Sequence, residues 1–192
     1  MINRYFSHED IKQKFVAVRQ RAISIYKELT DNCFKYEFDQ EKWNICQHFD
    51  HLLKFGEYHI PVLDRVLLNV VENRLFSNEP LHLHPGEEKL IDRIQNTHED
   101  LLSPSYLFMP ENNRSKGSVF IKFVSMQDLF ISQINLVDGY SLSEFEVELT
   151  LDYGYTLKPG TAFLMIAGYE MRHLEFVEHL KTEMAAENLD LV

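Results

Sequence analysis

Apolar residues recur at helical spacing in several long segments of the chain. The first segment begins after Ser7, which together with Asp10 predicts a capping box, and it ends at the polar stretch 30–32. Intervals of three and four residues between its apolar positions indicate one face of an amphipathic helix of about six turns. These positions are Ile11, Phe15, Val18, Ala22, Ile25 and Leu29.

A second helix is predicted from near Asp39 to beyond Val70. Its apolar arc is broad, which indicates burial on more than one side. Pro61 lies inside this segment and has no N–H to donate to the carbonyl of Glu57. We therefore expect a kink at Pro61 and not a break.

Residues 76–117 have the character of a long connection. They contain four prolines and a turn-like sequence at 111–113. One shorter helical pattern lies within them, and its apolar positions are Leu90, Ile91, Ile94 and Leu101. We expect this segment to cross over between the second and third long helices.

The C-terminal half of the chain predicts two further helices and a strand between them. The third long helix carries Phe120, Val124, Gln127, Ile131 and Ile134 and ends near 138–139. Alternating apolar positions in 145–153 predict a short strand. The last helix opens after Pro159 and extends to about Glu187. Four long helices with a crossover between the second and third predict an all-α fold, a four-helix bundle in a single domain over residues 1–192.

Composition narrows the classes of function. The chain has 192 residues and a formal net charge of −11, which opposes binding to nucleic acid. It contains no run of about 18 apolar residues that would span a membrane, and its first ten residues lack the order of a secretory signal. Cys33 and Cys46 form no C-x-x-C pair. We therefore expect a cytoplasmic protein with free thiols and with no nucleic-acid or membrane partner.

Histidines on the predicted helix faces are the main candidates for chemistry. His173 lies within the apolar stripe of the last helix, where a lone imidazole is more often a hydrogen-bonded core residue than a ligand. His48 and His51 lie on one side of the second helix, and His59 points in nearly the same direction as His48. Facing histidines of this kind build metal sites in four-helix bundles. Neutral imidazoles suit Zn²⁺, Ni²⁺ or Fe²⁺.

Other catalytic motifs carry less information. Glu170 and His173 have the Glu-x-x-His spacing of di-iron bundles, but such a site needs two of these motifs and two further glutamates. The other instance, Glu79 to His82, lies in the proline-rich connection, so coincidence is the simpler interpretation. The chain has no Gly-x-Ser-x-Gly motif and no phosphate-binding glycine loop.

Residues 41–52 resemble the second-helix signature of the DinB/YfiT-like family, in which a Trp begins the helix and a later His binds metal. Trp43 and His51 stand at those two positions. Residues 160–174 are similar to the last helix of that family, which ends in His-x-x-x-His, and His173 matches the second of these histidines. The resemblance extends to helix order and chain length. It implies a metal-dependent bundle, since members include thiol-dependent transferases, isomerases that use a small thiol, and proteins regarded as hydrolases.

Tyr169 stands where this family has the first His of the terminal pair. A neutral phenol is a poor ligand because its pKa is near 10. The resemblance therefore leaves three outcomes for a site around His51 and His173. In the first, His48 or Glu170 completes a shifted metal site. In the others, Tyr169 coordinates as a phenolate, or the metal has been lost.

Two classes of function follow. In the first, the chain is a divalent-metal-dependent transferase or hydrolase that acts on a small molecule or thiol, with its site around His51 and His173. In the second, it is a metal-free and non-catalytic bundle in which Tyr169 and these histidines form a buried hydrogen-bonded cluster, and it binds a small ligand or a partner. A homodimer formed through apolar helix faces is compatible with either class.

Overall fold

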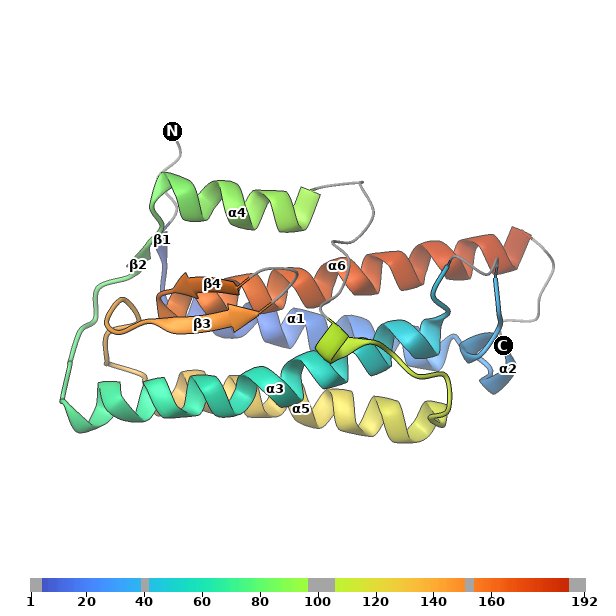
Figure 1. Ribbon diagram of the computed structural model, residues 1–192, viewed down its shortest axis with the longest axis horizontal. Coiled ribbons are helices and arrows are strands. Elements are labelled where there is room, and N and C mark those ends of the chain that lie inside the picture. Colours follow the sequence, from blue (N-terminus) through green and yellow to red (C-terminus); the bar gives the residue numbers. More distant parts are fainter. Residues whose placement is uncertain (1–4, 39–41, 97–105, 151–153, 187–192) are drawn as a thin grey trace.

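The computed structural model describes residues 5–38, 42–96, 106–150 and 154–186 (Figure 1). These residues are mostly helical, as the periodicity predicts. The long helices are α1 (His8–Lys27), α3 (Ile45–Glu72), α5 (Lys116–Leu136) and α6 (Pro159–Ala186). The shorter helices are α2 (Asp31–Phe34), α4 (Pro85–Asn96) and the 3₁₀ turn η1 (Tyr106–Phe108).

The long helices enclose an apolar core. Helix α1 packs against α5 and α6, and α3 packs against the same two helices from the other side (Figure 1). Aromatic rings join these helices: Phe15 of α1 stacks on Phe130 of α5 with 4.9 Å between ring centroids, and it meets the edge of Phe163 of α6 at 6.0 Å. All three rings are fully buried.

Side-chain caps set the first residues of α1 and α3. The predicted capping box of α1 is confirmed, because the backbone N–H of Asp10 donates to Ser7 Oγ at 3.1 Å and the backbone N–H of Ser7 donates to the Asp10 carboxylate at 2.8 Å. The prediction that the second helix begins near Asp39 is wrong. Helix α3 begins at Ile45, since Asn44 forms a capping box with the Gln47 side chain; Asp39 itself lies outside the described residues.

Helix α3 continues through Pro61 without a break, as expected. It comes close to α5 at Gly56, where a side-chain Cβ would overlap Met126. The absence of a side chain at Gly56 therefore allows α3 and α5 to approach each other closely at this point.

The connection between α3 and α5 contains β2 (Leu81–His82), which pairs antiparallel with β1 (Tyr5–Phe6), followed by α4 and η1. The predicted helical pattern of the connection is confirmed over α4, whose buried residues Ile91 and Ile94 face α6. Leu101, which that pattern also included, lies outside the described residues.

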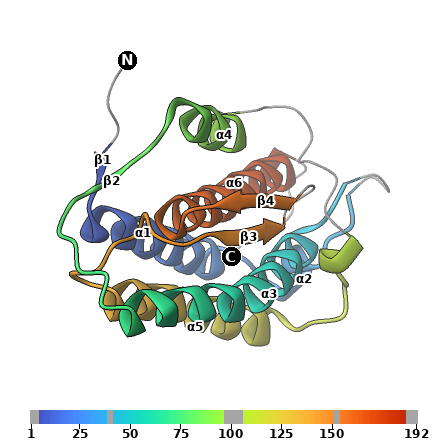
Figure 2. The same ribbon diagram turned by 60° about the vertical axis from the view of Figure 1, so that its left-hand side comes forward.

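A β-hairpin lies between α3 and α6 (Figure 2). The predicted strand is confirmed as β3 (Val147–Thr150), which pairs antiparallel with β4 (Gly154–Leu157). The hairpin and α4 cover faces of α6 that α1 and α3 leave open, so every residue from Pro159 to Glu170 is buried. Helix α6 ends at Ala186, and the predicted end at Glu187 lies outside the described residues.

None of the helices in the described segments is long and apolar enough to cross a membrane.

Candidate functional site

Four polar side chains meet inside the helix assembly, and we refer to them as the histidine cluster. They are His48 and His51 of α3 and Tyr169 and His173 of α6. His51 and His173 are fully buried, and only 4% of Tyr169 and 6% of His48 is exposed. The structure thus brings together four of the five residues for which the sequence predicts a metal site.

Hydrogen bonds determine the protonation of His51. Its Nδ1 lies 2.8 Å from the carbonyl oxygen of Phe108, which can only accept, so Nδ1 carries the proton. In the neutral ring Nε2 is then an acceptor. The Tyr169 hydroxyl lies 2.7 Å from this Nε2 and therefore donates to it. Phe108, His51 and Tyr169 form a directed chain of hydrogen bonds from α6 to the end of the connection.

His48 and His173 form the other half of the cluster. Their Nδ1 atoms are 3.0 Å apart, so one ring donates an N–H to the lone pair of the other. The Nε2 atom of His173 is buried and has no hydrogen-bond partner among the described residues. An unpaired polar atom in the interior lowers the free energy of unfolding by about 1–3 kcal/mol. His173 Nε2 is therefore the energetically least favourable atom of the cluster.

Trp43 closes the cluster on the side of the helix start. Its ring centroid lies 5.6 Å from that of His48, 5.1 Å from that of His51 and 6.3 Å from that of His173. In this apolar surrounding, burial lowers the pKa of His48 to about 3 and that of His51 to about 4. Burial also lowers the pKa of His173 well below its usual value, and the neighbouring imidazoles add to this. The three imidazoles are therefore neutral at physiological pH.

The arrangement does not fit a resident metal ion. An ion needs lone pairs from several ligands directed at one point, but the Nε2 lone pair of His51 accepts the Tyr169 proton. Between His48 and His173, the Nδ1 lone pair of one ring likewise accepts the Nδ1 proton of the other. Within the described segments, no group of three or more His, Cys, Asp or Glu side chains is placed so that it could hold an ion. The geometry is that of a hydrogen-bonded cluster.

Glu170, the fifth predicted residue, turns to α5 instead of to the cluster. One oxygen of its carboxyl group accepts from the Gln127 amide at 3.1 Å, and the other has no partner among the described residues. The side chain is fully buried, and this burial raises the pKa of Glu170 to about 8. Glu170 is thus a neutral acid at physiological pH and is no ligand in this arrangement.

His59 does not join the cluster either. Its Nδ1 donates to the carbonyl of Phe55 at 2.8 Å, and its Nε2 accepts from the backbone N–H of Thr150 at 3.0 Å. Both ring nitrogens are satisfied, so His59 connects α3 to the hairpin. Its role is structural.

Asp50, next to His51, was missed by sequence reasoning. Its carboxylate is fully buried, accepts from the backbone N–H of Glu111 at 2.8 Å and forms ion pairs with Lys54 and Arg114. These contacts hold the end of the connection against α3, close to the Phe108 carbonyl that fixes His51. The only indications in the sequence were an Asp between the apolar positions of the predicted second helix and Lys54 four residues later.

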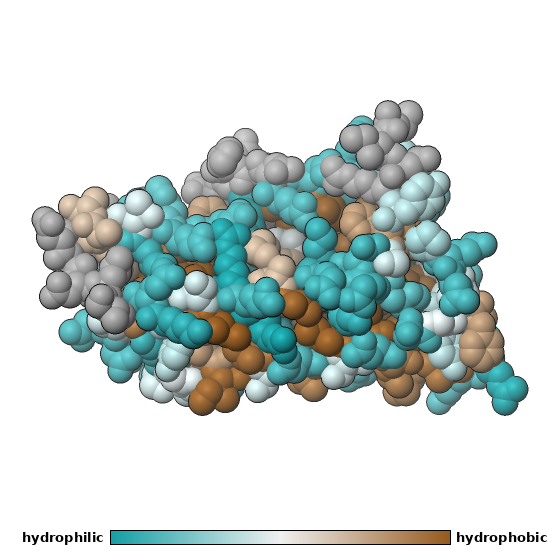
Figure 3. Space-filling view, turned by 180° about the vertical axis from the view of Figure 1, so that it is seen from behind, coloured by the Kyte–Doolittle hydropathy of each residue, from teal (hydrophilic) through white to brown (hydrophobic). Residues whose placement is uncertain are grey.

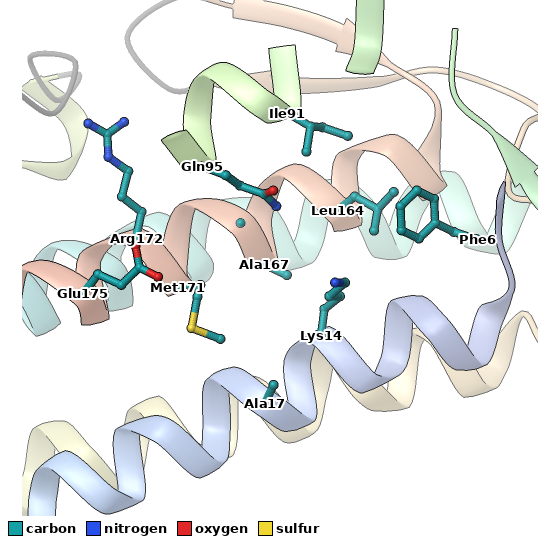
Figure 4. A pocket seen from close by; sticks show the side chains of 11 residues that line it. Phe6, Lys14, Ala17, Ile91, Gln95, Leu164, Ala167, Met171, Arg172 and Glu175 are labelled. Carbon is teal, nitrogen blue, oxygen red and sulfur yellow. The ribbon is translucent and has the colours of Figure 1, made fainter. Parts of the chain in front are cut away.

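A cavity of about 570 Å³ lies on the other side of α6, between this helix, α1 and α4. Figure 4 shows Lys14 and Ala17 reaching in from α1 and Gln95 from α4, with Arg172 and Glu175 at one end. Arg172 is buried, and its guanidinium donates to the carbonyl of Ile94 at 3.2 Å.

No protein-family model, curated protein or solved structure matches the chain.

Proposed function

We propose that this chain is a metal-independent, DinB/YfiT-like four-helix bundle that binds a small molecule in the cavity between α1, α4 and α6. Metal independence rests on one observation: the Tyr169 hydroxyl lies 2.7 Å from Nε2 of His51 and uses the lone pair that a metal ion would need. In this proposal the histidine cluster stabilises the bundle, and its neutral imidazoles do no chemistry.

Helix packing supports the bundle. Helices α1, α3, α5 and α6 each contact two of the others, and the segment with α4 and η1 connects α3 to α5. This is the order of helices and crossover that the resemblance implies. Trp43 and His51 are the two residues of the second-helix signature, and their rings pack against each other.

The chemistry of the cavity supports a small amphipathic ligand. Its volume of about 570 Å³ falls within the usual range of ligand sites, which are mainly apolar with a few polar groups. Ile91, Leu164 and Met171 supply apolar walls, while Lys14 and Arg172 supply positive charge. Lys14 has no ion pair or hydrogen bond among the described residues. Glu175, at the same end of the cavity as Arg172, pairs with Arg21 at 3.2 Å. An apolar molecule with an acid group that binds Lys14 and Arg172 therefore fits these features best.

Binding of the fluorescent probe 8-anilinonaphthalene-1-sulfonate, an aromatic anion, tests the cavity. We expect the natural protein to bind this probe and Ala17→Trp to weaken binding at least tenfold, because a large side chain at position 17 fills the space under α4. Gln20→Trp, also exposed on α1 but outside the cavity lining, is the matched control and should bind as the natural protein does. Equal binding by all three proteins would place the probe elsewhere and contradict the proposal.

Elemental analysis of protein purified without an affinity tag or chelator tests metal independence. We expect the natural protein to carry far less than one equivalent of Zn, Ni or Fe, and Tyr169→His to acquire metal, because an imidazole at position 169 would present a lone pair instead of a hydroxyl proton. One equivalent in the natural protein would overturn the proposal. It would instead support the metal-dependent transferase or hydrolase that the resemblance implies.

A further inference from the structure

The cavity between α1, α4 and α6 changes in chemistry along α6. Its lining residues on this helix run from Leu164 to Glu175, a length of about 16 Å at a rise of about 1.5 Å per residue. Phe6, Ile91 and Leu164 make one end apolar, whereas Arg172 and Glu175 lie at the other end (Figure 4). A ligand that fills this cavity is therefore elongated, with an apolar end and a polar end.

The cavity opens on a surface of mixed polarity. Lys14, Ala17 and Gln95, which belong to its lining, are exposed to solvent. Helix α1 lies behind the hairpin in Figure 1, and the view from behind shows apolar atoms among hydrophilic ones on that face (Figure 3). A molecule with both apolar and polar groups can thus enter the cavity directly from solvent.

Two polar groups enter the middle of the cavity from different helices. The Lys14 ammonium group comes from α1, and the Gln95 amide comes from α4 (Figure 4). Within the described part of the chain, Lys14 forms no ion pair and the Gln95 side chain forms no hydrogen bond. The Gln95 amide offers both N–H donors and a carbonyl acceptor. The middle of the cavity can therefore bind an acid group and a second group that both donates and accepts.

Contacts between α4 and α6 hold the Gln95 side chain in place. The Arg172 guanidinium donates to the carbonyl of Ile94 at 3.2 Å and so ties the end of α4 to α6. Gly168 of α6 lies under the amide, since a Cβ at this position would be 3.0 Å from Gln95 Nε2. The absence of a side chain at Gly168 leaves room for the amide against α6. A recognition group that is already in position loses less entropy when a ligand binds.

We propose that the ligand of this cavity is an acid with an apolar chain and a secondary amide next to its carboxylate, as in an N-acylated amino acid. This inference rests on the proposed function and adds the chemical class of the ligand. The acyl chain lies at the end with Phe6 and Leu164, and the carboxylate binds Lys14 and Arg172. The amide pairs with Gln95, because a secondary amide has one N–H and one carbonyl to match the acceptor and donor of that side chain.

Calorimetric titration of the full chain with two matched acids tests this class of ligand. Octanoylglycine contains the amide, and undecanoate has the same chain length with methylenes in place of the amide. We expect Gln95→Leu to weaken the binding of octanoylglycine, relative to that of undecanoate, by about two- to tenfold, the range for one hydrogen bond. Gln20→Leu, exposed on α1 and outside the cavity lining, is the matched control and should leave the ratio of the two affinities unchanged.

Two further variants separate the role of the amide from that of the ammonium group. Gly168→Ala keeps Gln95 but displaces its side chain, so the ratio of affinities should change in the same direction as in Gln95→Leu. This variant should fold, because Ala is favoured over Gly inside a helix and the atoms that it meets belong to a flexible side chain. Lys14→Met should weaken the binding of both acids by about tenfold and leave their ratio unchanged, because both acids carry the carboxylate.

The possible outcomes distinguish this inference from the proposed function. An unchanged ratio of affinities in Gln95→Leu, with both acids still bound, would overturn the amide class and leave the cavity as a ligand site. A natural protein that binds the fluorescent probe in the cavity but neither acid would also overturn this inference alone. Binding of neither the probe nor the acids would overturn the inference and the proposed function together.

Discussion

Replacing Asp50 by Asn should lower the free energy of unfolding by about 3 kcal/mol, the lower end of the range for breaking a buried ion pair. The carboxylate is fully buried and pairs with Lys54 at 3.2 Å and with Arg114. Asn keeps the size of the side chain and can still accept from Glu111, so the change isolates the charge. The loss stays near the lower end because the side chains of both cations keep 21–25% of their surface exposed.

Urea denaturation measures this effect as a shift of the transition midpoint at unchanged slope. Asp31→Asn is the control, since the Asp31 side chain is 88% exposed and lies 3.9 Å from Lys116. An exposed pair of this kind contributes at most about 1 kcal/mol. A loss below about 1 kcal/mol for Asp50→Asn would show that the connection does not depend on this carboxylate.

Replacing Glu170 by Gln should make the protein more stable at alkaline pH. The pKa of Glu170 is raised to about 8 in the folded protein because the carboxyl group is completely buried, whereas in the unfolded chain it is close to the ordinary value for Glu. Between these two values the folded state binds more protons than the unfolded state. Stability therefore falls as the pH rises from about 4.5 to about 8, and Gln cannot ionise.

At pH 8 and above, the free energy of unfolding of Glu170→Gln should exceed that of the natural protein by an amount on the order of 4 kcal/mol. This is the value expected when the pKa of a fully buried group is raised from its ordinary value to about 8. Near pH 4 the natural protein and the variant should have nearly equal stability. Both proteins share the buried histidines, whose ionisation in the unfolded state lowers stability below about pH 6.5, so that contribution cancels in the difference.

Free energies of unfolding measured from pH 4 to pH 9 test this prediction. Glu175→Gln, on the same helix but at a side chain that is 52% exposed, is the control and should change stability little at any pH. A difference between Glu170→Gln and the natural protein that stays constant over the whole range would contradict the raised pKa.

Periodicity alone located the long helices, because a helix that packs on one face repeats its apolar positions every three to four residues. Ser7 and Asp10 marked the start of α1 correctly, since a capping box is a local interaction. The start of α3 was placed wrongly because apolar spacing does not show the residue at which helical hydrogen bonding begins. The Asn44–Gln47 capping box marks that residue. Strand β4 was missed because its pairing with β3 is not visible in its own sequence.

The candidate site was predictable only as a set of residues. His51, His173, Tyr169 and His48 could be chosen because they share buried helix faces. What each nitrogen does depends on partners far away in sequence: the Phe108 carbonyl, 57 positions from His51, fixes the proton on Nδ1. Tyr169, 118 positions away, then occupies Nε2. Glu170 was assigned as a candidate ligand, yet Gln127 of α5 binds it.

The sequence by itself determined the helical class, the approximate positions of the main helices and the buried histidines, because these follow from local spacing. Tertiary structure alone decided how the imidazoles share protons, which acid is buried without a cation, and where a cavity remains. These properties arise from contacts between segments, and the free energy of a buried polar group depends on the atoms that surround it and not on its neighbours in the chain.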